Sequence, residues 1–149
     1  MKLSRREQAT INSALTILEK HARKGEQFLN TEMAIDYFRL MIGGEGREHF
    51  AVAYLDNSLR LIESRIESIG SLNYVDVDPK EILRSALTLE ATHVILAHNH
   101  PSGKAMPSQH DIDLTKTIKE TLGLCDVMVC EHVIVTNEDA YSFSKDGNL

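Results

Sequence analysis

The sequence predicts an α/β protein in which helices flank a mixed β-sheet. Segments with helical periodicity alternate with short runs rich in Val, Ile and Leu, in the predicted order α-α-β-β-α-β-α-β-β. One run, residues 94–97, is wholly apolar, as expected of a central strand that is covered on both faces. A chain of 149 residues that is 42% apolar can bury one sizeable core, so we expect one compact domain.

The first part of the chain, residues 1–45, is predicted to be a helical extension packed on a domain of residues 46–149. Ser4 has the pattern of a helix N-cap, and apolar residues then recur at helical spacing. Thr31 is expected to begin a second helix, which a glycine pair ends at Gly43.

The remaining elements follow from alternating apolar patterns and from helix-start and turn signals. They are a β-hairpin of strands 48–55 and 59–69, a helix from Asp78-Pro79 to about Glu90, the strand 94–97, a helix from Gln109 to Leu122, and final strands at 125–135 and 140–143.

The segment 98–111 contains most of a metal site. His98 and His100 are two residues apart, so on extended chain both imidazoles leave from the same side and can reach one ion. Ser108 is a good N-cap, which puts Asp111 in the first turn of the next helix. Two imidazoles and one carboxylate leave a coordination position open, as catalytic zinc sites do.

These residues resemble the JAMM (JAB1/MPN) metalloprotease-like domains, whose signature reads Glu…His-x-His-Pro-x6-Ser-x2-Asp. Residues 97–103 and 131–135 look like the RadC branch of that superfamily, although Glu131-His132 stands where RadC-type chains usually carry Asp-His. The resemblance covers about residues 46–149 and implies a cytidine-deaminase-like arrangement of the sheet. The helix-hairpin-helix region of long RadC proteins has no counterpart in the first 45 residues, so the chain resembles the short form. The signature positions are filled by His98, His100, Pro101, Ser108 and Asp111.

The resemblance implies a zinc-dependent hydrolase of peptide or isopeptide bonds. It also implies a glutamate outside the ligand set as general base, and Glu48 matches the RadC form Glu-x-Phe before an apolar strand. Ser108 is expected to cap its helix and to offer its hydroxyl to the oxyanion. On chemistry alone, four other glutamates compete with Glu48 for the role of base: Glu45, Glu63, Glu67 and Glu90.

Other histidines are less informative. His132 is open to two interpretations, because it could support the site from a neighbouring strand or simply pack. His110 is expected to point away from the carboxylate of Asp111, toward solvent. The letters His-Asn-His at 98–100 carry little weight as an HNH nuclease signal, since that name describes dispersed residues.

Three alternative functions remain open. The chain could be a DNA-repair-associated factor or nuclease, as the RadC name suggests, or a non-catalytic MPN scaffold. Its donor set also suits non-haem iron. Sixteen basic against twenty-two acidic residues give a net charge of −6, which disfavours free-standing DNA binding, so nucleic acid should bind weakly or indirectly.

Composition predicts a cytoplasmic protein with no membrane contact, because no apolar run is long enough for a membrane span. Cys125 and Cys130 are five residues apart, so on a strand they face opposite sides. We expect both to be reduced and to serve packing. A protein or peptide substrate is the expected partner, and the oligomeric state is left open.

Overall fold

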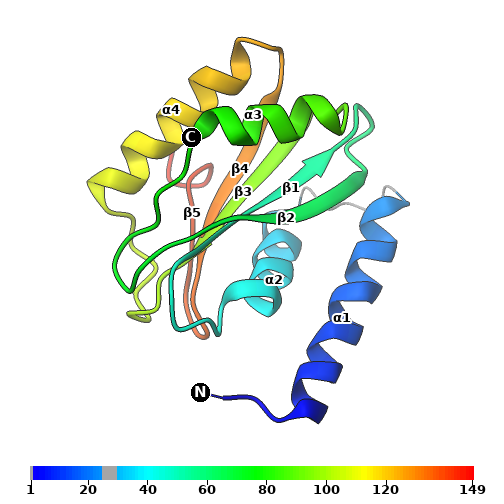
Figure 1. Cartoon of the computed structure of the whole chain (residues 1–149), viewed down its shortest axis with the longest axis vertical. Helices are drawn as coiled ribbons and strands as arrows, with labels where there is room; N and C mark the ends of the chain where they lie inside the picture. The colour runs from blue at the N-terminus through cyan, green and yellow to red at the C-terminus, as the bar shows by residue number, and fades with distance from the viewer. Residues whose placement is uncertain (1, 25–29) are drawn as a thin grey trace.

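A computed structural model describes residues 2–24 and 30–149 of the chain. Over these ranges four helices surround one five-stranded mixed sheet, so the predicted α/β class is confirmed (Figure 1). The element order matches the predicted order. The elements are α1 (Arg5–Arg23), α2 (Thr31–Ile42), β1 (His49–Leu55), β2 (Leu61–Ile69), α3 (Pro79–Thr88), β3 (His93–Asn99), α4 (Gln109–Gly123), β4 (Met128–Val135) and β5 (Ala140–Ser142).

The strands lie in the order β2-β1-β3-β4-β5, which puts β3 in the centre of the sheet, as its apolar sequence predicts. β1 and β2 form the expected antiparallel hairpin, and β1 also runs antiparallel to β3. β3 and β4 are parallel, and the connection between them is the α4 crossover. The ends of β3 and of β4 therefore lie at the same edge of the sheet.

Helices cover both faces of the sheet, α1 and α2 on one side and α3 and α4 on the other (Figure 1). β1 shows how one strand serves both layers. Ala51, Ala53 and Leu55 belong to the core cluster under α2, whereas Phe50 and Val52 belong to the cluster under α3 and α4. Because side chains alternate along a strand, a one-residue step in sequence changes the layer.

The predicted helix starts agree with the observed caps. Ser4 and Ser108 each form a capping box with the residue three positions later, and Asp78 caps α3 with Pro79 at its first position. The second helix begins at Thr31, as expected, with Asn30 as its N-cap. Residues 25–29 of the predicted helical extension lie outside the described residues.

Two strands begin two or three residues later than predicted, whereas the starts of the other strands agree to within one residue. β2 begins at Leu61, because Leu59 takes a positive φ of 62° and the Asp56 carboxylate accepts the backbone N–H of Arg60. β4 begins at Met128, after Asp126 with a φ of 57°. The expectation that Cys125 packs on a strand is therefore wrong: it is exposed in the turn that precedes β4, where the left-handed residue delays the strand.

α2 packs directly on the sheet, with Phe38 and Ile42 fully buried against β1, β3 and β4. The division of the chain at residues 45 and 46 stays a prediction. No helix within residues 2–24 and 30–149 is long and apolar enough to cross a lipid bilayer.

The buried carboxylate of Glu131 joins β4 to three other parts of the fold. It accepts hydrogen bonds from the hydroxyl of Thr31 at the start of α2 and from that of Ser142 in β5. The hydroxyl and the backbone N–H of Ser144 also donate to it, as does the N–H of His132. Glu131 is only 5% exposed, so these donors replace the water that it loses on folding.

We expect Glu131→Gln to lower the free energy of unfolding by about 2–3 kcal/mol, because an amide has one acceptor oxygen and brings a competing donor. Urea unfolding followed by circular dichroism measures this change. Glu138→Gln is the matched control at an exposed position, where the change should stay within about 0.5 kcal/mol. Equal stability of the two variants would contradict the role given to Glu131.

Candidate metal centre

The two histidines of the motif meet at the end of β3. His98 is the penultimate residue of that strand and faces the α3 and α4 layer, where Phe50 stacks on its ring with 5.9 Å between the centroids. His100 follows the end of the strand. The Nε2 atoms of the two rings are 3.0 Å apart, so the two-residue spacing brings both imidazoles to one point as predicted.

Helix α4 brings Asp111 to the same point. The hydroxyl of Ser108 accepts the backbone N–H of Asp111 at 3.1 Å, and the Asp111 carboxylate accepts the N–H of Ser108 at 2.7 Å. This capping box fixes the first turn of the helix. One carboxylate oxygen lies 3.3 Å from Nε2 of His98, and the other lies 3.3 Å from Nε2 of His100.

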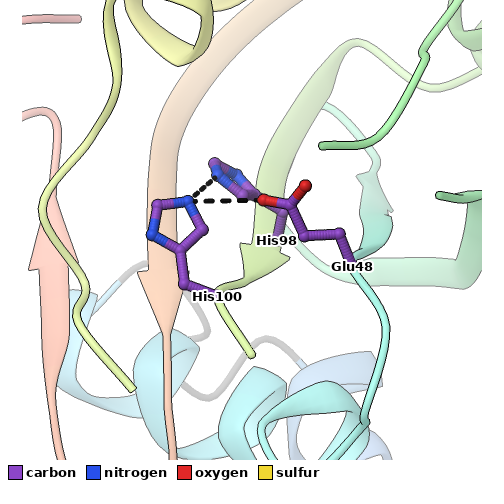
Figure 2. A group of neighbouring side chains, drawn as sticks. All are labelled: Glu48, His98 and His100. Carbon is purple, nitrogen blue, oxygen red and sulfur yellow. Dashed lines mark hydrogen bonds and ion pairs between the residues drawn. The ribbon is translucent and has the colours of Figure 1, made fainter. Parts of the chain in front are cut away.

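Glu48 approaches from the residue before β1. Its Oε1 lies 3.5 Å from Nε2 of His100, while Oε2 is buried with no hydrogen-bond partner among the described residues. Donor atoms of Glu48, His98 and His100 all lie within 4.8 Å of one another, close enough to share a metal ion (Figure 2). The structure thus places both the predicted base and the predicted ligand carboxylate beside the histidines.

The glutamates that compete with Glu48 on chemistry are engaged elsewhere or lie apart. Glu63 pairs with Arg65 on β2, and Glu67 accepts the hydroxyl of Tyr54. Glu45 lies 4.0 Å from His49, and Glu90 is exposed after α3. Among the described residues, Glu48 is the glutamate in the cluster that can hold a metal.

The donor atoms fit a small four-coordinate cation. Zinc binds nitrogen and oxygen at about 2.0–2.1 Å in a tetrahedron, which separates its donor atoms by about 3.3 Å. The observed separations are 3.0 Å between the two imidazole nitrogens and 3.3 Å from each nitrogen to Asp111. Nδ1 of His100 lies 2.8 Å from the carbonyl oxygen of Lys104, which can only accept, so Nδ1 carries the hydrogen. In the neutral ring, Nε2 of His100 then carries the lone pair.

The charges around Asp111 also favour a cation. Burial alone would raise the pKa of Asp111, but the contacts of its carboxylate with His100 and His98 hold that pKa well below its usual range. Burial alone would lower the pKa of His100, yet its bonds to Asp111 and to the Lys104 carbonyl raise it. An ionised carboxylate that attracts a proton to the neighbouring imidazole attracts a metal ion at the same place.

Burial has a different outcome at Glu48 and at His98. It raises the pKa of Glu48, because the attractions of His100 and His110 do not offset the loss of water and the repulsion by Asp111. It lowers the pKa of His98 and so keeps that ring neutral, the state in which imidazole binds metals. The two carboxylates beside the histidines thus have pKa values shifted in opposite directions, a pattern that separates a proton carrier from a permanent anion.

A cavity of about 470 Å³ opens over this cluster. One wall is the turn 70–74, in which the exposed side chains of Leu72 and Tyr74 face the cavity. The turn is tied to Glu48 by two backbone bonds, from Glu48 N–H to the Ser71 carbonyl and from Gly70 N–H to the Glu48 carbonyl, each 2.8 Å long. A Cβ at position 70 would lie 2.2 Å from the carbonyl oxygen of Tyr74, so only glycine fits there.

Ser108 and His110 also line the cavity. Ser108 is exposed, and its hydroxyl serves the capping box as predicted. His110 is exposed, as expected, but it is not isolated, because the ring of Tyr74 meets it edge-on with 5.9 Å between centroids.

Asn99, between the two histidines, is a residue whose role sequence reasoning missed. Its side chain points to the opposite face of β3 from His98 and is completely buried. It accepts the N–H of His49 at 2.6 Å and donates to the carbonyls of Glu45 and Arg47 at 3.2 and 3.0 Å. Asn99 therefore fastens the segment that carries Glu48. Its only signal in the sequence is a polar residue inside an otherwise buried strand.

The structure resolves the open question about His132. The residue is fully buried in β4, and its Nε2 lies 2.8 Å from Nδ1 of His98. It therefore supports the site from the neighbouring strand, and it also packs, since Phe143 stacks on its other side with 4.4 Å between centroids.

Comparison with known proteins places this geometry in a family. A family model described as "RadC-like JAB domain" matches residues 28–148. The chain belongs to the RadC-like JAB domain family. It is 40% identical over 143 residues to the UPF0758 protein YfjY of Escherichia coli K12, an alignment that covers 95% of this chain and 89% of the relative.

Other members of the RadC family are similar in the same way. The UPF0758 protein YkfG of E. coli K12 is 40% identical over 93% of this chain and 89% of its own length. A UPF0758 protein of Janthinobacterium sp. strain Marseille is 44% identical over 81% of this chain, but the alignment covers only 54% of that longer relative. None of these names states a reaction.

Removing the side chain of Asn99 should loosen the Glu48 segment. We expect Asn99→Ala to lower the free energy of unfolding by about 1–3 kcal/mol, because a buried backbone N–H and two carbonyls lose their partner. Amide hydrogen exchange in residues 45–49 should also become faster. Asn12→Ala, on the exposed face of α1, is the control and should change neither quantity appreciably. Unaltered exchange at His49 in Asn99→Ala would refute the assignment.

Proposed function

We propose that this chain is a zinc-dependent hydrolase of amide bonds, in peptides or isopeptides, in which His98, His100 and Asp111 hold the metal. The observation that carries the proposal is the contact of two imidazole Nε2 atoms, 3.0 Å apart, with one carboxylate 3.3 Å from each. Without a cation or a proton between them, such acceptors repel one another. Membership of the RadC-like JAB domain family supports the same conclusion.

If His98, His100 and Asp111 held zinc, the metal would activate a water molecule as the nucleophile and polarise a substrate carbonyl. The proposal favours zinc over iron because the donor separations match a tetrahedron and because three protein ligands leave one position open. Asp111 is proposed as the ligand carboxylate, since its oxygens reach both histidines and its pKa is held low.

Glu48 is proposed as the group that moves the proton. It takes a proton from the attacking water and returns it to the leaving nitrogen when the amide bond breaks. Its raised pKa, caused by burial, suits a carboxyl that must be able to hold a proton for part of the cycle. Its buried Oε2 has no partner among the described residues, so one oxygen remains free for this transfer.

Ser108 is proposed to stabilise the oxyanion of the attacked carbonyl. Its oxygen already accepts the backbone N–H of Asp111, so its hydroxyl proton can point into the cavity that it lines. A donor placed beside the developing negative charge strengthens its hydrogen bond in the transition state.

The other functional classes find less support. A nuclease has to attract phosphates, and the net charge of −6 together with two carboxylates in the cavity opposes that. A scaffold has no need to bury Glu48, His98 and Asp111 beside a fourth titratable group, because the burial of polar groups costs stability.

The metal proposal predicts close to one zinc per chain. His100→Ala should abolish stoichiometric zinc binding with the fold largely intact, because the remaining donors sit on a preformed scaffold. Elemental analysis of protein purified without added metal, with circular dichroism as the check on folding, measures this. His110→Ala is the matched control: it removes an imidazole from the same cavity and should keep the zinc. Full zinc content in His100→Ala would remove the histidine from the ligand set.

The division of roles between the carboxylates predicts that Glu48→Gln keeps zinc and loses activity. Loss of an acid-base group typically lowers the rate by about 10²–10⁴-fold. A panel of peptide and isopeptide reporters is first screened with the wild-type protein, and Glu45→Gln, an exposed neighbour, is the control. Loss of zinc in Glu48→Gln would make Glu48 a ligand, and full activity would exclude it as the base.

A further inference from the structure

A line of three hydrogen-bonding side chains begins at His98, runs away from the cavity through His132 and ends at Thr115 in helix α4. Nδ1 of His98 contacts Nε2 of His132 at 2.8 Å, and Nδ1 of His132 contacts the hydroxyl of Thr115 at 2.7 Å. His132 and Thr115 are at most 1% exposed. Their hydrogen bonds must therefore be satisfied within the protein.

The direction of each bond in this line follows from its far end. The Thr115 hydroxyl donates to the backbone carbonyl of Asp111, one turn earlier in α4, at 2.6 Å. A hydroxyl has one proton, so its oxygen has to accept from His132, and Nδ1 of His132 carries the hydrogen. In a neutral imidazole the other nitrogen then carries a lone pair, so Nε2 of His132 accepts from Nδ1–H of His98.

We infer that Thr115 and His132 are positioning residues that hold His98 in its Nδ1–H tautomer, with the Nε2 lone pair directed at the metal centre. Metal-binding histidines commonly donate their second ring N–H to a neighbour that fixes the tautomer and the ring orientation. Here the neighbour of His98 is the imidazole of His132, which can accept only if its own hydrogen is on Nδ1. The bond from Nδ1 of His132 to the Thr115 hydroxyl fixes that tautomer. The effect on zinc affinity rests on the proposed function, whereas the tautomer itself does not.

Ring packing supports this assignment. Phe50 stacks on His98 with an interplanar angle of 11°, and Phe143 stacks on His132 at 10°. The two phenyl rings limit tilting of the imidazoles and keep water from their faces. Because the N–H groups and lone pairs of an imidazole lie in its ring plane, this stacking leaves the ring nitrogens free to bond along the line to Thr115.

The helix offers a matched pair of substitutions. Thr115→Val keeps the shape of the side chain but removes the hydroxyl, and Thr115→Ser keeps the hydroxyl. Thr117→Val is the control for the helix, because Thr117 makes the same bond to the carbonyl four residues earlier, at 2.9 Å, on the exposed face.

Two measurements on the full-length chain test the inference. Nitrogen-15 NMR of the histidine rings in metal-free protein should show His98 as the Nδ1–H tautomer in wild type, in Thr115→Ser and in Thr117→Val. Zinc competition with a chelator should give a 10–100-fold weaker affinity for Thr115→Val and changes below about threefold for the other two variants.

The outcomes separate the inference from the proposed function. An Nε2–H tautomer of His98 in wild type overturns the inference, and so does wild-type zinc affinity in Thr115→Val. If wild type binds no zinc but shows the Nδ1–H tautomer, which Thr115→Val disturbs, the proposed function fails and the tautomer assignment stands. If Thr115→Val does not fold, two other measurements decide. One is the tautomer of His98 in the wild-type spectrum. The other is the zinc affinity of His132→Gln, which should stay close to that of wild type because the Gln carbonyl can still accept from His98.

Discussion

The fold has to hold several acceptor groups face to face in a buried place. At the end of β3 two imidazole nitrogens lie 3.0 Å apart, and an ionised carboxylate lies 3.3 Å from both. Groups of this kind separate unless the surrounding structure is rigid or a positive charge lies between them. The central strand, the capping box of α4 and the packed aromatic rings together supply that rigidity, because each fixes one of the groups from its own element.

Because side chains alternate along β3, consecutive residues of this strand make stabilising contacts in the two helical layers. His98 points toward α4 and is fixed from behind by His132. The next residue, Asn99, points toward α2 and fastens the segment that carries Glu48. β4, which pairs in parallel with β3, also contributes one residue to each layer. His132 contacts His98, and Glu131 accepts a hydrogen bond from Thr31 at the start of α2. Two consecutive residues on each strand thus stabilise opposite faces of one site.

The order of the elements and most residues of the candidate site could be predicted, because the sequence patterns that determine them are local. The spacing of His98 and His100, the N-cap at Ser108 and the apolar run of β3 each act within a few residues, and the family resemblance joined them to Glu48. The roles of Asn99 and Thr115 could not be read in this way, because their partners lie on other elements or depend on which face a side chain takes. The apolar pattern places the start of β4 too early, because the left-handed conformation of Asp126 leaves no clear signal in the sequence.

The turn 70–74 is joined by backbone hydrogen bonds to Glu48, whose carboxyl lies beside His100. The cavity wall that a ligand would touch is therefore coupled to Glu48 directly through the backbone, so the two move together. Gly70 makes the joint tight, since no other residue lets the chain pass so close to Tyr74. In this chain the shape of the wall and the position of the Glu48 carboxyl are therefore coupled: an insertion that enlarges the turn would also shift Glu48.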